Sequence, residues 1–155
     1  MELINAIPQD ALRLAELNQK MIQDSGHNNG LGHEGLYHRM RDWLISGEYQ
    51  AHFISYDGQM IGYCLTRRES GQAHLRQFYI EPEYRRNGLG TQAVQLLLNG
   101  HLSGMEMIHL DVHPGNAAGI DFWRANGFDG APEFMQLNLR QLNHGGAERL
   151  GPLRK

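Results

Sequence analysis

A basic, glycine-containing stretch at residues 84–91 is the part of the sequence most directly suited to chemistry. It reads Tyr-Arg-Arg-Asn-Gly-Leu-Gly-Thr, with Arg85 and Arg86 followed by Gly88 and Gly90. Glycines let a backbone approach a ligand closely, and the free amides of a following helix N-terminus favour a bound anion. The stretch therefore predicts a phosphate-binding loop, for which a diphosphate is a suitable ligand. The alternative is a tight turn bordered by solvated arginines.

A second polar pattern, His-x-Asp-x-His, occupies residues 109–113. If a strand runs from 105 to 112, alternation places His109, Asp111 and His113 on one face of it. Two imidazoles and a carboxylate can form a facial set of metal ligands. No further ligand cluster and no H-E-x-x-H helix supports that interpretation, so we expect no metal.

The glycine-containing stretch at 84–91 lacks the G-x-G-x-x-G and G-x-x-x-x-G-K-[ST] spacings. Their absence argues against nicotinamide and nucleoside-triphosphate sites.

The elements that must position these residues follow from hydrophobic periodicity and turn signals. The dipeptide Asp57-Gly58 separates two alternating runs, which predicts a hairpin. The glycine loop lies between a strand and a helix. We expect strands at 1–7, 49–56, 60–66, 74–80, 105–112 and 134–139, with helices from Pro8 to about 22, at 34–45 and 88–98, and from about 117 to 126.

This order predicts an α/β (α+β) fold, with a mixed, mostly antiparallel central sheet of about six to seven strands flanked by helices. The 155 residues have a globular composition, 41% hydrophobic and 20% charged. A chain of this size can bury a hydrophobic core without disulfides or structural metal ions. We expect a single domain over 1–142 and a flexible C-terminal tail over 143–155.

Charge and cysteine content narrow the classes of partner. The net charge of −3 provides no basic field for nucleic acid or an anionic membrane. The one cysteine, Cys64, cannot form an internal disulfide, which fits a reducing compartment. Neither a signal peptide nor a membrane span is apparent in the sequence. We expect a cytoplasmic protein with a small-molecule partner, and a homodimeric state stays open.

The glycine loop and a later block together resemble the GNAT superfamily of N-acetyltransferases over nearly the whole chain. The family's phosphate loop, [RQ]-x-x-G-x-[GA], matches Arg85 to Gly90. Its later signature, an L-[ED]-V strand, an asparagine and a helix closing in Gly-Phe, matches residues 110–112, Asn116 and 127–128. Either block alone is weak, but both occur in order and about 20 residues apart.

The resemblance implies that acetyl-CoA is the cosubstrate, bound without a metal. The backbone of Phe78, Tyr79 and Ile80 is expected to pair with the amides of the pantetheine arm. Asn116 would contact that arm, and Trp123 would line the thioester pocket or pack in the core. The expected cofactor loop consists of Arg85, Arg86, Asn87, Gly88, Leu89, Gly90 and Thr91.

Acetylation by direct attack needs a group to accept the proton of the amine and one to protonate the departing thiolate. Some family members carry a glutamate where Asp111 stands, and His74 matches the position of a catalytic glutamate in histone-acetylating relatives. Both are candidate bases, and the alternative for Asp111 is a polar residue on a half-exposed face. Many members carry a tyrosine acid where this chain has Trp123, whose indole N–H lacks accessible acidity.

The acceptor is expected to be a primary amine, with a small molecule favoured because no docking domain is appended. Asp24, Tyr37 and Tyr49 are candidate substrate contacts that would receive a cationic amine by ion pairing and aromatic contact. Two alternatives stay open. One is a protein or peptide acceptor, and the other is a non-catalytic module that binds or senses acyl-CoA.

Overall fold

The computed structural model describes residues 1–26 and 30–139. Helices and strands follow one another in the predicted order, which is therefore confirmed. Their bounds are β1 Glu2–Asn5, α1 Ala11–Ser25, α2 His33–Ser46, β2 Gln50–Tyr56, β3 Gln59–Glu69, β4 Gln72–Ile80, α3 Leu89–Asn99, β5 Met107–Leu110, α4 Ala117–Ala125 and β6 Met135–Asn138. Short 3-10 turns precede α1, β6 and the glycine loop. Among the described residues, no helix is both long and apolar enough to cross a bilayer.

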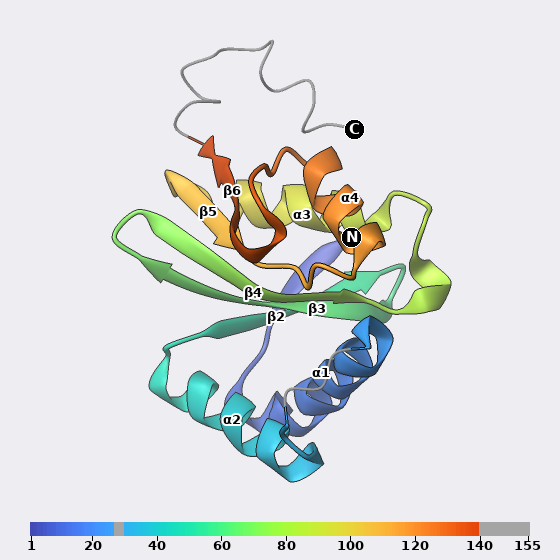
Figure 1. The fold of residues 1–155 in the computed structure, drawn as a ribbon. Coiled ribbons are helices and arrows are strands. Elements are labelled where there is room, and N and C mark those ends of the chain that lie inside the picture. Colours follow the sequence, from blue (N-terminus) through green and yellow to red (C-terminus); the bar gives the residue numbers. More distant parts are fainter. Residues whose placement is uncertain (27–29, 140–155) are drawn as a thin grey trace. The chain divides into compact units, whose positions relative to one another are not determined.

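The strands form a six-stranded sheet in the order β1-β2-β3-β4-β5-β6 (Figure 1). The pairs β1–β2, β2–β3 and β5–β6 are antiparallel, and β4–β5 is parallel. The predicted mixed, mostly antiparallel sheet is confirmed with six strands and four α-helices. The parallel register pairs residues 72–74 with residues 107–109.

Two tight turns join the central strands. Asp57 and Gly58 both have positive φ, 52° and 75°, as the predicted hairpin turn requires. Ser70 and Gly71 repeat this geometry with φ of 52° and 81°. Because this second turn is so short, β3 and β4 extend further than the predicted strands 60–66 and 74–80.

The chain divides into two compact units. The first, here called the N-terminal unit, consists of residues 1–67 and 76–85. The second, the C-terminal unit, consists of residues 68–75 and the chain from 86 onward. The expected single domain over 1–142 stays a prediction, and the expected tail over 143–155 lies outside the described residues.

Apolar residues at helical spacing place α1 and α2 in the core of the N-terminal unit. In α1, Ala11, Leu14 and Ala15 are fully buried, and the two helices lie side by side (Figure 1). Gly62 of β3 leaves no room for a side chain, because a Cβ there would overlap the Tyr79 carbonyl oxygen. The core of this unit comprises Ala6, Ala11, Leu14, Leu17, Met40, Tyr49, Ala51, Phe53, Tyr63, Leu65 and Tyr79.

Cys64 in β3 is 1% exposed and is the chain's one cysteine. Burial raises the pKa of its thiol from the ordinary 9.0 to about 12. The thiol therefore stays protonated and unreactive at neutral pH.

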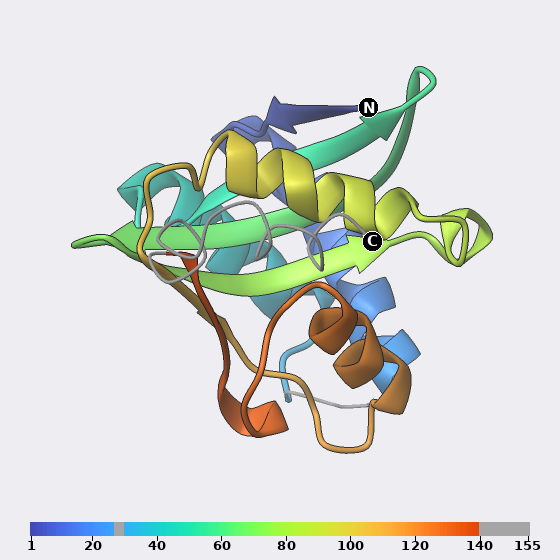
Figure 2. The same cartoon turned by 90° about the horizontal axis from the view of Figure 1, so that it is seen from above.

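The C-terminal unit holds α3 and α4 together with β5 and β6, seen from above in Figure 2. Leu97 of α3, Ile108 of β5 and Met135 of β6 are each at most 1% exposed. The register pairs Ile108 with Leu137 and Leu110 with Met135, so apolar side chains alternate inward along both strands.

The predicted strand 105–112 is too long, because β5 ends at Leu110. Beyond that point the Val112 amide donates to the Pro132 carbonyl, 2.7 Å away, instead of continuing the ladder. His113 then closes a turn by accepting a hydrogen bond from the Gly115 amide at its Nδ1, 3.0 Å away. The expectation that His109, Asp111 and His113 share one strand face is therefore wrong, since only His109 lies within the strand.

Candidate functional site

The glycine loop turns its backbone in the way an anion site requires. Arg86 and Gly88 have φ of 66° and 85°, both in the left-handed region, and Gly88 is the residue that caps α3. Alternating left-handed residues point successive amides toward one side. The Leu89 amide contacts the Asn87 side-chain oxygen at 3.4 Å, and the next amides of α3 have no partner within the helix.

The Arg85 side chain points away from this cluster of amides. Its Nε donates to the Ile80 carbonyl at 2.6 Å, and its Nη1 lies 2.8 Å from the Asp24 carboxylate. The guanidinium also covers the Tyr79 ring, 5.3 Å from the centroid. Arg85 therefore fastens the start of the loop to the end of β4 and to α1, and its expected contact with the cofactor stays a prediction.

Gly90 and Thr91 have structural roles inside the C-terminal unit. A Cβ at Gly90 would lie 3.0 Å from Cε1 of Phe122, so glycine lets α3 approach α4 closely. The Thr91 hydroxyl accepts a hydrogen bond from Asn126 Nδ2 at 3.4 Å. The second glycine of the motif thus serves helix packing as well as the loop.

Asn116 and Trp123 occupy the two ends of α4. Asn116 Oδ1 accepts a hydrogen bond from the Gly119 amide at 3.0 Å and so caps the helix. Trp123 is 8% exposed and packs edge-on against Phe122 and Phe128, with centroids 4.8 and 5.3 Å away. Whether either residue also touches the cofactor stays a prediction.

The structure brings the two candidate bases together. His74 Nε2 lies 3.8 Å from Asp111 Oδ1, and their side chains are 16% and 69% exposed. The His74 ring stacks on His109 at 4.8 Å and an interplanar angle of 5°. His109 in turn stacks on Phe134 at 5.3 Å. The separation of 3.8 Å permits charge coupling but exceeds a hydrogen bond.

The end of β4 contains the residues expected to pair with the pantetheine arm. The register of β4 with β5 runs to the pair His74–His109, upstream of Phe78. The Tyr79 hydroxyl donates to Glu81 Oε1 at 3.0 Å, and Lys20 binds the other oxygen of that carboxylate at 3.1 Å. Burial and then Glu81 raise the pKa of Tyr79 from 10.0 to about 12.

A polar network in the N-terminal unit was not predicted from the sequence. Asn18, Tyr63 and Gln77 are at most 6% exposed. Tyr63 donates to Gln77 Oε1 at 2.7 Å, and Asn18 Oδ1 faces donors from Gln77 at 3.5 Å and Arg39 at 3.3 Å. Two features of the sequence could have indicated it: an asparagine within the apolar stripe of α1, and a glutamine on the same face of β4 as Leu75 and Tyr79.

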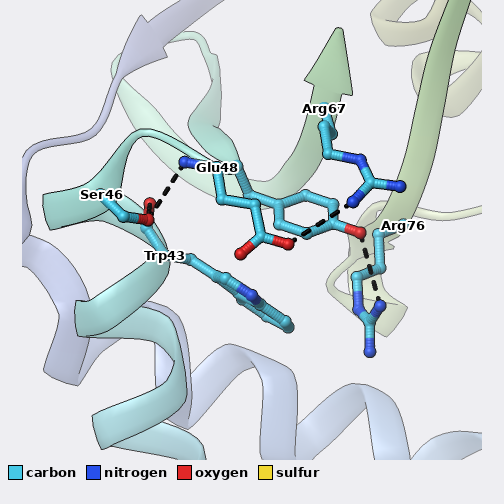
Figure 3. A network of polar contacts seen from close by, with 6 residues as sticks. Trp43, Ser46, Glu48, Arg67 and Arg76 are labelled. Carbon is cyan, nitrogen blue, oxygen red and sulfur yellow. Dashed lines mark hydrogen bonds and ion pairs between the residues drawn. The ribbon is translucent and has the colours of Figure 1, made fainter. Parts of the chain in front are cut away.

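Arginines of the same unit also lie against aromatic rings, and Figure 3 shows Arg67 and Arg76 with Trp43 and Glu48. Arg39 and Arg76 lie 4.6 and 4.8 Å from the centroid of Trp43. Arg76 also donates to the Tyr49 hydroxyl at 3.4 Å, and Arg67 lies 5.3 Å from the Tyr49 centroid.

The three predicted substrate contacts all lie in the N-terminal unit, and each already has a partner. Tyr49 is 3% exposed and is flanked by arginines, Asp24 is paired with Arg85, and half-buried Tyr37 lies 5.1 Å from the His38 ring. The region gathers positive charge from the protein itself. Receipt of a cationic amine there stays a prediction.

Within residues 1–26 and 30–139, no group of three or more histidine, cysteine, aspartate or glutamate residues is arranged to hold a metal. His109 and Asp111 are held instead by ring stacking and by the contact with His74.

Comparison with known proteins identifies the family to which this sequence and fold belong. The profile of the acetyltransferase (GNAT) family matches residues 15–128, which include the glycine loop, β4, β5 and α4. The chain belongs to the acetyltransferase (GNAT) family. The sequence resemblance stated from the two motifs is thereby confirmed.

Individual members of the GNAT family resemble the chain more distantly. The [ribosomal protein bS18]-alanine N-acetyltransferase of Escherichia coli K12 is 29% identical over 87 residues, which is 55% of this chain and 59% of the relative. The chain thus matches less than two thirds of that protein.

Two solved GNAT structures share the fold. An acetyltransferase from Thermus thermophilus has a TM-score of 0.68 and 22% identity, covering 87% of this chain and 93% of that one. The PaiA N-acetyltransferase from Thermoplasma acidophilum, solved in complex with coenzyme A, has a TM-score of 0.64 and 19% identity, covering 88% and 98%.

Proposed function

We propose that the protein is an acetyl-CoA-dependent N-acetyltransferase that acts on a primary amine. The observation that carries this proposal is the loop at 85–91, where left-handed Arg86 and Gly88 precede the free amides of α3 at the family's phosphate motif. Backbone amides at a helix N-terminus bind a diphosphate without a basic side chain. The modest net charge of −3 is compatible with such a site.

Acetyl-CoA would be held mainly by backbone atoms. The loop amides would bind its pyrophosphate, and the backbone of Phe78, Tyr79 and Ile80 would pair with the pantetheine arm as an added strand does. The Ile80 carbonyl also accepts a hydrogen bond from Arg85. Bound acetyl-CoA supplies the activated thioester.

In the reaction, the amine nitrogen attacks the thioester carbonyl carbon, and a C–N bond replaces the C–S bond. The amine's proton passes to His74 or Asp111, directly or through water. The two candidate groups lie 3.8 Å apart. The departing sulfur takes a proton from solvent, because the buried Trp123 indole can donate a hydrogen bond but not a proton.

The proposal also concerns the chemical class of the acceptor. The curated E. coli relative acetylates an alanine of a ribosomal protein, whereas we propose a small amine for this chain. We also propose a single catalytic domain over 1–142, a cytoplasmic location and an optional homodimer. The second candidate function is an acyl-CoA-binding module without catalysis, which the tryptophan in place of the tyrosine acid favours.

Release of free thiol from acetyl-CoA tests the proposal. Purified protein would be mixed with acetyl-CoA and a panel of small amines, peptides with free N-termini and aminoglycosides, and thiol would be followed colorimetrically. We expect thiol release that depends on both enzyme and amine. Thermal stabilisation by acetyl-CoA without release by any amine would favour the binding module. No stabilisation and no release would refute both functions.

A further inference from the structure

The cluster of Arg39, Trp43 and Arg76 carries positive charge that has no anionic partner. Arg39 bonds to the Asn18 amide and Arg76 to the Tyr49 hydroxyl, both neutral groups. In the part of the chain that the structure describes, neither forms an ion pair. Two neighbouring arginines do: Arg67 lies 3.5 Å from Glu48 and Arg85 lies 2.8 Å from Asp24. Arg39 and Arg76 are therefore two adjacent charges of this unit without a carboxylate partner among the described residues.

Buried donors face the same cluster. Arg39 Nε and Asn18 Nδ2 are buried and have no hydrogen-bond partner among the described residues. Gln77 and Arg39 both donate to Asn18 Oδ1, which fixes the orientation of the amide. The Asn18 side chain also interacts with the Tyr63 hydroxyl. A buried donor left unsatisfied costs about 1–3 kcal/mol, so these groups favour a ligand that brings oxygen acceptors.

The electrostatics of Arg39 agree with this. Burial, followed by repulsion from Arg76, lowers the pKa of the Arg39 guanidinium. A bound anion would offset both effects, because it neutralises the pair and replaces lost hydration. Two guanidiniums held against one indole also present planar N–H donors suited to bidentate contact with a carboxylate.

We propose that Arg39, held by its hydrogen bond to the Asn18 side chain, and Arg76 bind a carboxylate of the acceptor, so that the acceptor class is small amino acids. This inference rests on the proposed acetyltransferase function. A carboxylate supplies both the negative charge and the planar pair of oxygen acceptors that two guanidiniums can bind. In a peptide acceptor, the carboxyl group of the first residue is part of an uncharged peptide bond. Such an acceptor would leave the charges of Arg39 and Arg76 without a counter-charge.

The cluster is placed to orient such an acceptor. Arg76 is exposed and Arg39 and Trp43 are half-buried, and Arg39 is bonded to Asn18 of the buried polar network. Arg76 precedes Phe78 by two residues in β4, about 7 Å along a strand. The carboxylate would then be held beside the stretch proposed for the pantetheine arm, and the amine end would be free to reach the thioester.

Matched acceptors test the assignment. Amino acids with one to four carbons between amine and carboxylate would each be compared with the corresponding amide in the thiol-release assay. We expect kcat/KM for the best acid to exceed that of its amide by about 10- to 100-fold, the range for a hydrogen bond to a charged group. Amidation makes an α-amine less basic, so a larger fraction of the amide is deprotonated and able to attack at neutral pH. Intrinsic reactivity alone would therefore favour the amide over the acid. Equal rates for acid and amide, or a preference for peptides or phosphate-bearing amines, would overturn the proposal.

Variants separate recognition from structure. In Arg39→Gln and Arg76→Gln, we expect KM for the acid to rise about 10-fold or more at nearly constant kcat, with the amide unaffected. The matched control is Arg67→Gln, which alters an arginine of the same aromatic group that already has Glu48 as partner. It should leave both substrates unchanged. Equal losses for acid and amide would indicate a merely structural role.

A binding arm keeps this test independent of catalysis. The Nε–H resonances of the arginines would be followed by NMR while β-alanine is titrated into protein loaded with CoA. We expect the Arg39 signal, assigned by its loss in Arg39→Gln, to shift on addition of β-alanine but not of β-alaninamide. Thiol release by no amine, with this shift present, would refute the proposed reaction and retain the subsite. No shift up to the solubility limit would refute the subsite.

Discussion

The glycine loop and the arginine–tryptophan cluster are both suited to anions, but by opposite means. In the loop, left-handed Arg86 and Gly88 point backbone amides outward, while the nearby Arg85 guanidinium is paired with Asp24. In the cluster, side chains from α2 and β4 provide the charge. The loop should therefore tolerate side-chain changes that preserve its backbone, and the cluster should not.

The largest effect is expected from Gly88→Glu. A glutamate at this left-handed position adds strain of about 1–2 kcal/mol and places a carboxylate at the proposed pyrophosphate site. We expect acetyl-CoA affinity, measured by calorimetry, to fall more than about 100-fold, which corresponds to ~2.7 kcal/mol. The matched control is Gly104→Glu, because Gly104 has nearly the same φ of 84° and equally open surroundings. Affinity retained in Gly88→Glu would mean that the loop does not bind the cofactor.

The next effect concerns proton transfer beside His74. Asp111→Asn keeps the shape of the side chain but removes its charge, and we expect kcat to fall about 100-fold, the low end for general-base catalysis. Water reaches the 69% exposed carboxylate and can partly replace it. CoA affinity should not change, and Asp121→Asn on α4 serves as the control. An unaltered pH–rate profile in Asp111→Asn would remove the residue from the mechanism.

A smaller effect is expected when the buried network is broken. Gln77→Ala leaves the Tyr63 hydroxyl without its acceptor 2.7 Å away. We expect the free energy of unfolding to fall by about 1–3 kcal/mol, measured by urea denaturation. Gln72→Ala, at the exposed start of the same strand, should change it by less than about 0.5 kcal/mol. Similar values for the two variants would show that the network contributes little.

The most gradual effect is a loss of stability in alkali. Cys64 and Tyr79 have folded-state pKa values raised to about 12, so their contribution is fully present below pH 9. From pH 9–10 to about 12 the unfolded chain releases protons that the folded chain retains. The free energy of unfolding should then fall by up to about 1.4 kcal/mol per pH unit for each group. In Tyr79→Phe the slope between pH 10 and 12 should be shallower, and an identical slope would contradict the assignment.

Local signals explain what the sequence alone predicts well here. The succession of elements follows from apolar periodicity and from turn residues such as Asp57-Gly58, and the phosphate loop follows from the spacing of Gly88 and Gly90. These features depend on residues close together in the chain. Strand ends are harder to predict, because the end of β5 is determined by where the Val112 amide finds its partner, the distant Pro132 carbonyl.

The arginine–tryptophan cluster could not be predicted for the same physical reason. Asn18, Arg39 and Arg76 come from α1, α2 and β4, and only the folded N-terminal unit brings them together. Arg85 shows the converse limit. An arginine at this position predicts a positive charge at the loop. In the folded protein the Arg85 guanidinium instead pairs with Asp24 and donates to the Ile80 carbonyl.

The burial of Cys64 gives the protein a practical advantage for spectroscopy. Its thiol is the chain's one native cysteine, and at 1% exposure it is shielded from maleimide reagents. A second cysteine introduced on the surface, for example at exposed Ser103, would therefore take up a single fluorophore or spin label in the otherwise natural chain. Cofactor binding could then be followed by site-specific probes without first removing a core residue.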